Sequence, residues 1–156
     1  MVALKTLMFT IVVGGMVLFI VPWLLLRSEG TSMIPSLSIW LIGLLPFLLG
    51  AALYFWCAGA FTFIGKGTPA PFDAPIFLVR EGPYRRVRNP MYLSVLSMLL
   101  GEVILFHSLS LFVMLLVAIT VVHLFVIFYE EPHLTRQFGE SYKEYLRTVP
   151  RWLPRF

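Results

Sequence analysis

Residues 91–129, MYLSVLSMLLGEVILFHSLSLFVMLLVAITVVHLFVIFY, determine the fold of this chain more than any other stretch. They contain two apolar runs, Met91–Phe106 and Ser108–Tyr129, which meet at the polar pair His107-Ser108. A helix of about 20 apolar residues crosses a hydrocarbon layer about 30 Å thick. The first run is somewhat shorter than this and the second has the full length. Because only a short polar break separates them, the stretch predicts a helical hairpin in a membrane.

Two further apolar runs, Thr6–Leu26 and Leu37–Ile64, precede the hairpin. Of the 156 residues, 59% are hydrophobic and 13% are charged, and the mean hydropathy is +0.88. Soluble domains are about half apolar and about a quarter charged, so these values exclude a water-soluble globule. We therefore expect residues 1–156 to form one all-α integral membrane domain with four transmembrane helices.

Two polar segments, residues 65–90 and 130–156, follow the second and fourth apolar runs. The first segment is rich in glycine, proline and arginine, which predicts a structured loop. In the second, apolar residues recur at three- and four-residue spacing, which predicts an amphipathic helix at the membrane surface. These apolar residues are Leu134, Phe138, Tyr142 and Tyr145.

Four spans place the N-terminus and both polar segments on the same side of the membrane. That side then holds eleven of the twelve lysine and arginine residues, and only Arg27 lies on the other. Basic residues concentrate on the cytoplasmic side of membrane proteins. We therefore expect cytoplasmic N- and C-termini, in the cytoplasmic membrane of a prokaryote. The formal charge of +4 reflects this orientation, and no nucleic-acid partner is expected.

Candidate site residues flank the hairpin on this side. The pair Glu130-Glu131 follows the fourth run, and Arg88-Asn89-Pro90-Met91-Tyr92 leads into the third. Short connections make the two places neighbours, and together they predict a pocket for a zwitterionic or cationic cofactor. The alternative is that the arginine and tyrosine anchor the interface and the carboxylates face water. The single cysteine, Cys57, offers no cluster for a metal.

Two ionisable residues lie within the predicted spans. His123 precedes Glu130 by seven residues, so both share a helix face, with His123 about 10 Å deeper. It is a candidate base lining a tunnel to the lipid, or else a neutral histidine bonded to a neighbouring helix. Glu102 fits a role in helix packing or at the interface equally well, so we do not expect it in the site. Small residues at helical spacing on the third run predict a close helix contact: Ser94, Ser97 and Gly101.

Two distant motifs resemble those of the isoprenylcysteine carboxyl methyltransferase family, membrane-integral enzymes related more loosely to phospholipid N-methyltransferases. Arg88-Asn89-Pro90-Met91-Tyr92 resembles the family's Arg-His-Pro-x-Tyr, and Glu130-Glu131-Pro132-His133-Leu134 resembles its Glu-Glu-x-x-Leu. Phe138 to Tyr145, followed by Val149-Pro150, is similar to its Phe-Gly-x-x-Tyr-x-x-Tyr and Val-Pro ending. The resemblance covers Glu81 to Phe156.

The resemblance implies a membrane-embedded methyltransferase that uses S-adenosylmethionine and whose cofactor pocket faces the cytoplasm. A lipophilic acceptor, a small molecule or a lipidated substrate from the membrane, would receive the methyl group by direct in-line displacement; a carboxylate is one such acceptor. An amine or thiol would need a base, for which Glu130 and His123 are the candidates. The cofactor-binding residues that the resemblance implies are Arg88, Asn89, Pro90, Tyr92, Glu130 and Glu131.

The sequence departs from the family pattern at three places. Asn89 replaces histidine, Ser94 stands where the family has glycine, and Ile127-Phe128-Tyr129 stands where eukaryotic prenylcysteine enzymes carry an arginine. The last difference argues against a prenylcysteine carboxylate as the substrate. Three other functions fit parts of the sequence: a sterol-reductase-like enzyme that uses a nicotinamide cofactor, a small proton-coupled transporter and a non-catalytic family member.

Overall fold

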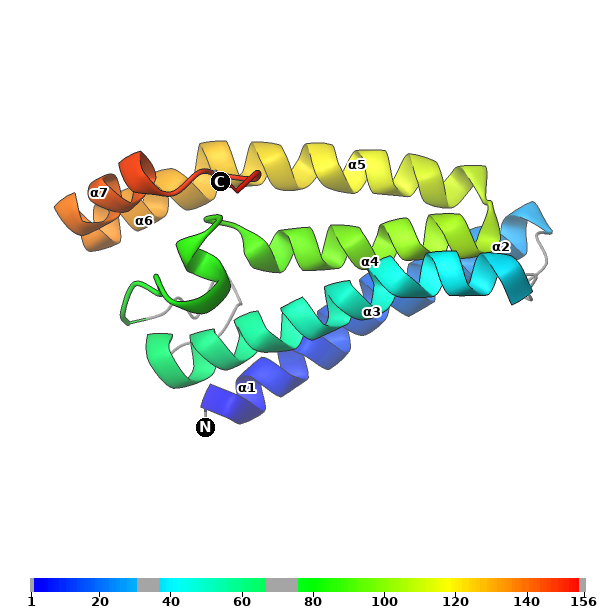
Figure 1. The fold of residues 1–156 in the computed structure, drawn as a ribbon, viewed down its shortest axis with the longest axis horizontal. Helices are drawn as coiled ribbons and strands as arrows, with labels where there is room; N and C mark the ends of the chain where they lie inside the picture. Colours follow the sequence, from blue (N-terminus) through cyan, green and yellow to red (C-terminus); the bar gives the residue numbers. More distant parts are fainter. Residues whose placement is uncertain (1, 31–36, 67–75, 155–156) are drawn as a thin grey trace.

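The computed structural model describes residues 2–30, 37–66 and 76–154, and of residues 37–39 it describes only the backbone. These residues form helices and short connections, and none of them forms a strand. Four helical stretches run back and forth along the long axis (Figure 1). One end, which we call the site end, holds the start of α1 (Val2–Phe9), η4 (Gly82–Arg85), α6 (Glu131–Phe138) and α7 (Glu140–Thr148). We call the opposite end the hairpin end.

One helix runs from Val2 to Glu29, and we call it the first helix. After α1 it contains the π-helical segments η1 (Thr10–Gly14) and η2 (Met16–Ile20), followed by α2 (Val21–Glu29). It ends at Gly30, whose φ of 67° is a left-handed conformation that glycine adopts at little cost. The predicted run Thr6–Leu26 lies within the first helix, which confirms this element.

The second and third runs also form helices. The second comprises α3 (Leu37–Ala60) and the π-helical η3 (Phe61–Gly65), and the third is α4 (Pro90–Phe106). The two helices lie antiparallel and pack along their lengths (Figure 1). Between them, Ser97 Oγ donates a hydrogen bond of 2.8 Å to the carbonyl oxygen of Pro46.

Small residues allow the backbones of α3 and α4 to touch. A Cβ atom added at Gly50 would lie 2.6 Å from the carbonyl oxygen of Ser94, and one added at Gly101 would lie 2.7 Å from that of Gly43. Such distances are too short for any side chain. The close helix contact predicted from the small residues of the third run is therefore confirmed, and glycine is required at both crossing points.

The turn of the hairpin forms where the sequence predicts it. His107 takes a left-handed conformation with φ 49°, and the Ser108 hydroxyl caps α5 (Leu109–Phe125) by accepting a hydrogen bond of 3.2 Å from the Leu111 amide. Glu29 joins the first helix to this turn, since its carboxylate accepts hydrogen bonds of 2.8 and 2.6 Å from the amide and hydroxyl of Ser110.

The polar part of the chain after α5 does not form the single amphipathic helix that the sequence predicts. After α5 the helix continues through the π-helical η5 (Val126–Glu130) into α6, breaks at Gly139 with φ 57°, and resumes as α7. The break lets α7 fold back, so the predicted apolar residues pack against the protein itself. Tyr142 and Tyr145 are buried with Val149, and partly buried residues pack against them: Leu78, Leu134, Phe138 and Leu146.

Three helices are long and apolar enough to cross a membrane: Val2–Glu29, Trp40–Gly65 and Leu109–Phe138. The remaining predicted span, the third run, corresponds to α4, a shorter apolar helix of 17 residues, about 25 Å long at 1.5 Å per residue. Within the predicted loop 65–90, residues 67–75 lie outside the described residues. The described part begins with a hydrogen bond of 2.9 Å from the Ile76 amide to the carbonyl oxygen of Gly65.

Candidate functional site

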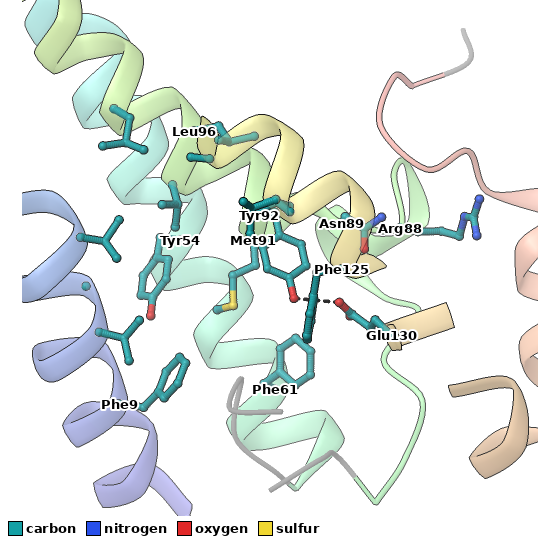
Figure 2. A pocket seen from close by; sticks show the side chains of 18 of the residues that line it. Phe9, Tyr54, Phe61, Arg88, Asn89, Met91, Tyr92, Leu96, Phe125 and Glu130 are labelled. Atoms are coloured by element: carbon teal, nitrogen blue, oxygen red, sulfur yellow. Dashed lines mark hydrogen bonds between the residues drawn. The ribbon is translucent and has the colours of Figure 1, made fainter. Parts of the chain in front are cut away.

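A cavity of about 410 Å³ extends from the site end into the helix bundle, between the first helix, α3, α4 and α5 (Figure 2). Most of the residues that line it are apolar. Apart from Tyr54 of α3, the polar ones come from η4, from the residues just before α4, from the first turn of α4 and from η5, so they gather at the site end. The polar lining residues are Tyr54, Tyr84, Arg88, Asn89, Tyr92 and Glu130.

The stretch that leads into α4 is held by the residues that follow α7. Pro90 occupies the first turn of α4, where its missing amide hydrogen costs nothing. The Arg88 amide donates a hydrogen bond of 2.9 Å to the carbonyl oxygen of Pro150. The Asn89 side-chain amide donates one of 3.2 Å to the carbonyl oxygen of Arg151. The position of Arg88 and Asn89 therefore depends on the C-terminal segment, residues 149–154.

Two arginines share the carboxylate of Glu131. Arg88 Nη1 donates a hydrogen bond of 2.8 Å to Oε1. Arg151 binds through two nitrogens, with Nε 2.7 Å from Oε1 and Nη2 2.9 Å from Oε2. Glu131 and Arg88 are largely buried, with 15% and 10% of their side chains exposed. Two guanidinium groups against one carboxylate leave this ion-pair cluster with a net positive charge.

The neighbouring carboxylate has a different partner. Tyr92 donates a hydrogen bond of 2.7 Å to Glu130 Oε2, and Figure 2 shows the two side chains meeting beside Phe125. Among the ion pairs found between described residues, none involves Glu130. The cavity therefore has a carboxylate without a cationic partner on its wall. Arg88 also lines the cavity, and its guanidinium end is directed toward the C-terminal segment (Figure 2).

The predicted cofactor residues come together at the site end, but not all of them reach the cavity. Arg88, Asn89, Tyr92 and Glu130 line it. Pro90 is buried at the start of α4, and Glu131 lies behind Arg88 in the ion-pair cluster. The expectation that the loop and the acidic pair are neighbours agrees with this geometry.

His123 has a structural partner. Its Nδ1 accepts a hydrogen bond of 3.1 Å from Trp152 Nε1, and it is not among the residues that line the cavity, although Val121 and Val122 are. The expectation that it lines a tunnel beside Glu130 therefore does not agree with this geometry. The histidine is bonded, as in the alternative, but to Trp152 of the C-terminal segment and not to a neighbouring helix. The helix passes through the π-helical η5 between the two residues, which changes the angle between their side chains. Glu102 is buried in α4 and does not line the cavity.

Sequence reasoning missed two contributors to the site. One is the pair Arg151 and Trp152, which directly follows Val149-Pro150. The other is the first helix, which supplies part of the cavity wall through Phe9, Val13, Gly14 and Val17. These four residues carry no chemical signal, so only their place in the fold identifies them.

The tyrosines behind the ion-pair cluster stay protonated at neutral pH. Burial raises the pKa of Tyr142 to about 12, with the nearby Glu131 carboxylate adding to the effect. Burial likewise raises the pKa of Tyr84 and of Tyr145. Tyr145 donates a hydrogen bond of 2.6 Å to the carbonyl oxygen of Tyr84 and so fixes η4 against α7. Hydrogen bonding to Glu131 raises the pKa of Arg151.

Comparison with known proteins identifies one family. A family model described as phospholipid methyltransferase matches residues 39–141. No curated protein and no solved structure matches the chain. The match covers well over half of the chain and includes Arg88, Tyr92, Glu130 and Glu131, whereas the first helix and the C-terminal segment lie outside it. The chain therefore belongs to the phospholipid methyltransferase family and is an integral membrane protein.

Proposed function

We propose that this protein transfers a methyl group from S-adenosylmethionine to a lipophilic acceptor in the membrane. The observation that carries the proposal is the distribution of charge at one cavity. The net positive cluster of Arg88, Arg151 and Glu131 lies beside the carboxylate of Glu130, which has no cationic partner among the described residues. Family membership independently supports methyl transfer.

The residues at the site fit this cofactor. S-adenosylmethionine carries a carboxylate together with an ammonium and a sulfonium group, and so needs one positive and one negative protein partner. Arg88 Nε is buried and has no hydrogen-bond partner in the described structure, which leaves a charged donor for a carboxylate. A volume of about 410 Å³ also falls within the range of about 300–1,000 Å³ typical of small-molecule pockets.

Each residue has a distinct role in the proposal. When bound, S-adenosylmethionine supplies an electrophilic methyl group. Arg88 would hold the cofactor's carboxylate, and Asn89 and Tyr92 would complete the polar end of the cavity. Glu130 would attract the positive charge, and it would accept the proton of an acceptor that must lose one. Pro90 and Glu131 would position these groups without contacting the cofactor. Because His123 is bonded to Trp152, Glu130 is the base that we favour.

The acceptor side of the proposal follows from the membrane location. The apolar walls of the cavity suit a hydrocarbon group and exclude water, and positioning two reactants in a dry site accounts for much of the acceleration in such a transfer. The resemblance to isoprenylcysteine carboxyl methyltransferases supports a carboxylate as the accepting group. Such an anion would need no base.

Four spans and a cytoplasmic site end complete the proposal. Although α4 is short, it packs against α3 along its length, and four crossings would put most of the basic residues on the cytoplasmic side of a prokaryotic membrane. The cofactor would then enter from the cytoplasm. The reductase and transporter hypotheses gain no comparable support. Proton-coupled transport needs a carboxylate within the membrane, and Glu102, which lies within a predicted span, does not line the cavity.

Calorimetry with S-adenosylhomocysteine tests the cofactor site, using the full chain purified in detergent. The wild-type protein should bind this demethylated product, and the variants Arg88→Ala and Glu130→Gln should bind it about tenfold more weakly or worse, since each loses a charged partner. The exposed residues Arg85 and Glu140 provide the matched controls Arg85→Ala and Glu140→Gln, which should bind normally. The absence of binding by the wild type, together with binding of a nicotinamide dinucleotide, would refute the proposal.

A further inference from the structure

We propose that the first helix selects the acceptor and that Gly14 determines how large a hydrocarbon group the cavity accepts. This inference rests on the proposed methyltransferase function, which it extends to a specificity-determining residue. The first helix lies outside residues 39–141, the part matched by the family model. Its contribution to the cavity therefore has to be argued from this structure.

The cavity has a polar end and a long apolar extension. Along η5 and α5 it reaches from Glu130 to Ala118, a distance of about 18 Å at 1.5 Å per residue. Beyond the polar end, Tyr54 is the one polar side chain among the described residues of the wall, and its hydroxyl lies 2.9 Å from the Thr10 hydroxyl. This extension offers no unpaired polar group to a ligand, so it suits a hydrocarbon chain.

The extension opens sideways between the first helix and α5. Val13 and Val121 both line the cavity, yet they remain 41% and 58% exposed. Both lie within helices long and apolar enough to span a membrane, so the surroundings of this opening are lipid tails. The occupant that reaches it most readily is therefore the hydrocarbon part of a membrane-dissolved acceptor, whose reactive group would lie toward Tyr92 and Glu130.

Gly14 is the position on this wall where a side chain would enter empty space. It lines the cavity at the end of η1, and a Cβ atom added there would meet no atom within 4 Å. Gly15 is equally open, with no atom within 4 Å of an added Cβ, but it does not line the cavity. A substitution at Gly14 therefore changes both the cavity and the first helix, whereas the same substitution at Gly15 changes the helix alone.

The test compares Gly14→Leu with Gly15→Leu in the full-length protein, purified in a steroid-based detergent. The ligand probe is hexadecanoate, a long straight chain with a carboxylate at its end, and its dissociation constant is measured by calorimetry. Binding of S-adenosylhomocysteine is measured on the same samples. Gly14→Leu should weaken hexadecanoate binding about tenfold or more, because the added side chain occupies space in the cavity that the hydrocarbon chain would fill. Gly15→Leu should leave it unchanged, and both variants should keep the wild-type affinity for S-adenosylhomocysteine.

The outcomes separate this inference from the proposed function. If the wild type binds hexadecanoate but no S-adenosylhomocysteine, the proposed function fails while the apolar site stands. If the two leucine variants bind hexadecanoate equally well, or if the wild type does not bind it, the role of Gly14 is refuted. Should Gly14→Leu fail to fold, the smaller Gly14→Ala replaces it and should weaken hexadecanoate binding measurably relative to Gly15→Ala.

Discussion

Glu130 and Glu131 are adjacent in the sequence but have separate partners. Consecutive residues of a helix point in directions about 100° apart, so Glu131 meets Arg88 and Arg151 while Glu130 meets Tyr92 at the cavity. This difference in direction leaves a net positive cluster beside a carboxylate that has no cationic partner within the described residues. The charge separation that a zwitterionic cofactor requires therefore arises from two neighbouring residues of the same type.

The hydrogen bond from Tyr92 to Glu130 can be tested by a single deletion. Tyr92→Phe leaves a partly buried carboxylate without its donor, which costs about 1 kcal/mol. We expect a lower melting temperature and a kcat/KM about tenfold lower once an acceptor is available. Tyr129→Phe is the matched control, because Tyr129 is 48% exposed and adjacent to Glu130. Equal effects of the two substitutions on thermal unfolding and activity would show that this hydrogen bond is unimportant.

At the scale of the elements, α3 and α4 provide the rigid part of the site. Their backbones touch because glycine occupies the crossing points. Asn89 immediately precedes α4 and Tyr92 lies in its first turn, and both line the cavity. A displacement of α4 would therefore move the polar end of the site.

Two glycines of α3 give a matched test of this packing. A Cβ at Gly50 would lie 2.6 Å from the Ser94 carbonyl oxygen, whereas one at Gly59 would meet nothing within 4 Å. Gly50→Ala should therefore lower the melting temperature. Gly59→Ala should leave it unchanged or raise it, because alanine favours a helix over glycine by about 1 kcal/mol. Thermal unfolding followed by circular dichroism in detergent measures both, and a stabilising Gly50→Ala would contradict the close contact.

The C-terminal segment is the second element on which the site depends. Arg151→Ala removes two hydrogen bonds to Glu131, and bonds between charged groups contribute about 1.5–3 kcal/mol. The pair is partly exposed, with 31% of the Arg151 side chain accessible, so we expect the low end of this range.

Because Glu131 then keeps Arg88 as its partner, Arg151→Ala should weaken S-adenosylhomocysteine binding by a few-fold while the helices remain intact. The exposed Arg147 supplies the control Arg147→Ala, which should bind normally. Calorimetry measures the affinity of each variant, and circular dichroism shows whether its helices remain intact. Wild-type affinity in Arg151→Ala would show that the C-terminal segment does not position the site. Arg151→Lys should restore part of the affinity, since lysine keeps the charge but loses the paired geometry.

For the whole molecule, the elements gathered at each end of the helix bundle predict how the chain is oriented in the membrane. The N-terminal part of α1, η4 and both C-terminal helices gather at the site end (Figure 1), where most of the basic residues lie. We expect alkaline phosphatase, which is active only outside the cytoplasm, to be inactive when fused after Phe156 or after Lys66 and active when fused after Gly30 or after His107. Activity after Phe156 would contradict the proposed four spans and their orientation.

Much of the fold followed from local patterns. Hydropathy predicted the helices around Thr6–Leu26 and Leu37–Ile64, and the polar break at His107 predicted the hairpin turn. The contact between Arg88 and Glu131 was also predictable, because short connections bring both residues to one end of the bundle. The fold of the tail was not, since an apolar face at helical spacing does not reveal whether it covers a membrane surface or packs against the protein.

Hydropathy and residue spacing are properties of nearby residues, so they were enough to predict the helices, the hairpin and the end of the bundle where the candidate site lies. The direction of each side chain within that end depends on distant partners instead. Packing between remote segments turned His123 toward Trp152, brought Arg151 to Glu131 and made the first helix a wall of the cavity. No local pattern encodes these contacts, because each joins residues that are far apart in the chain.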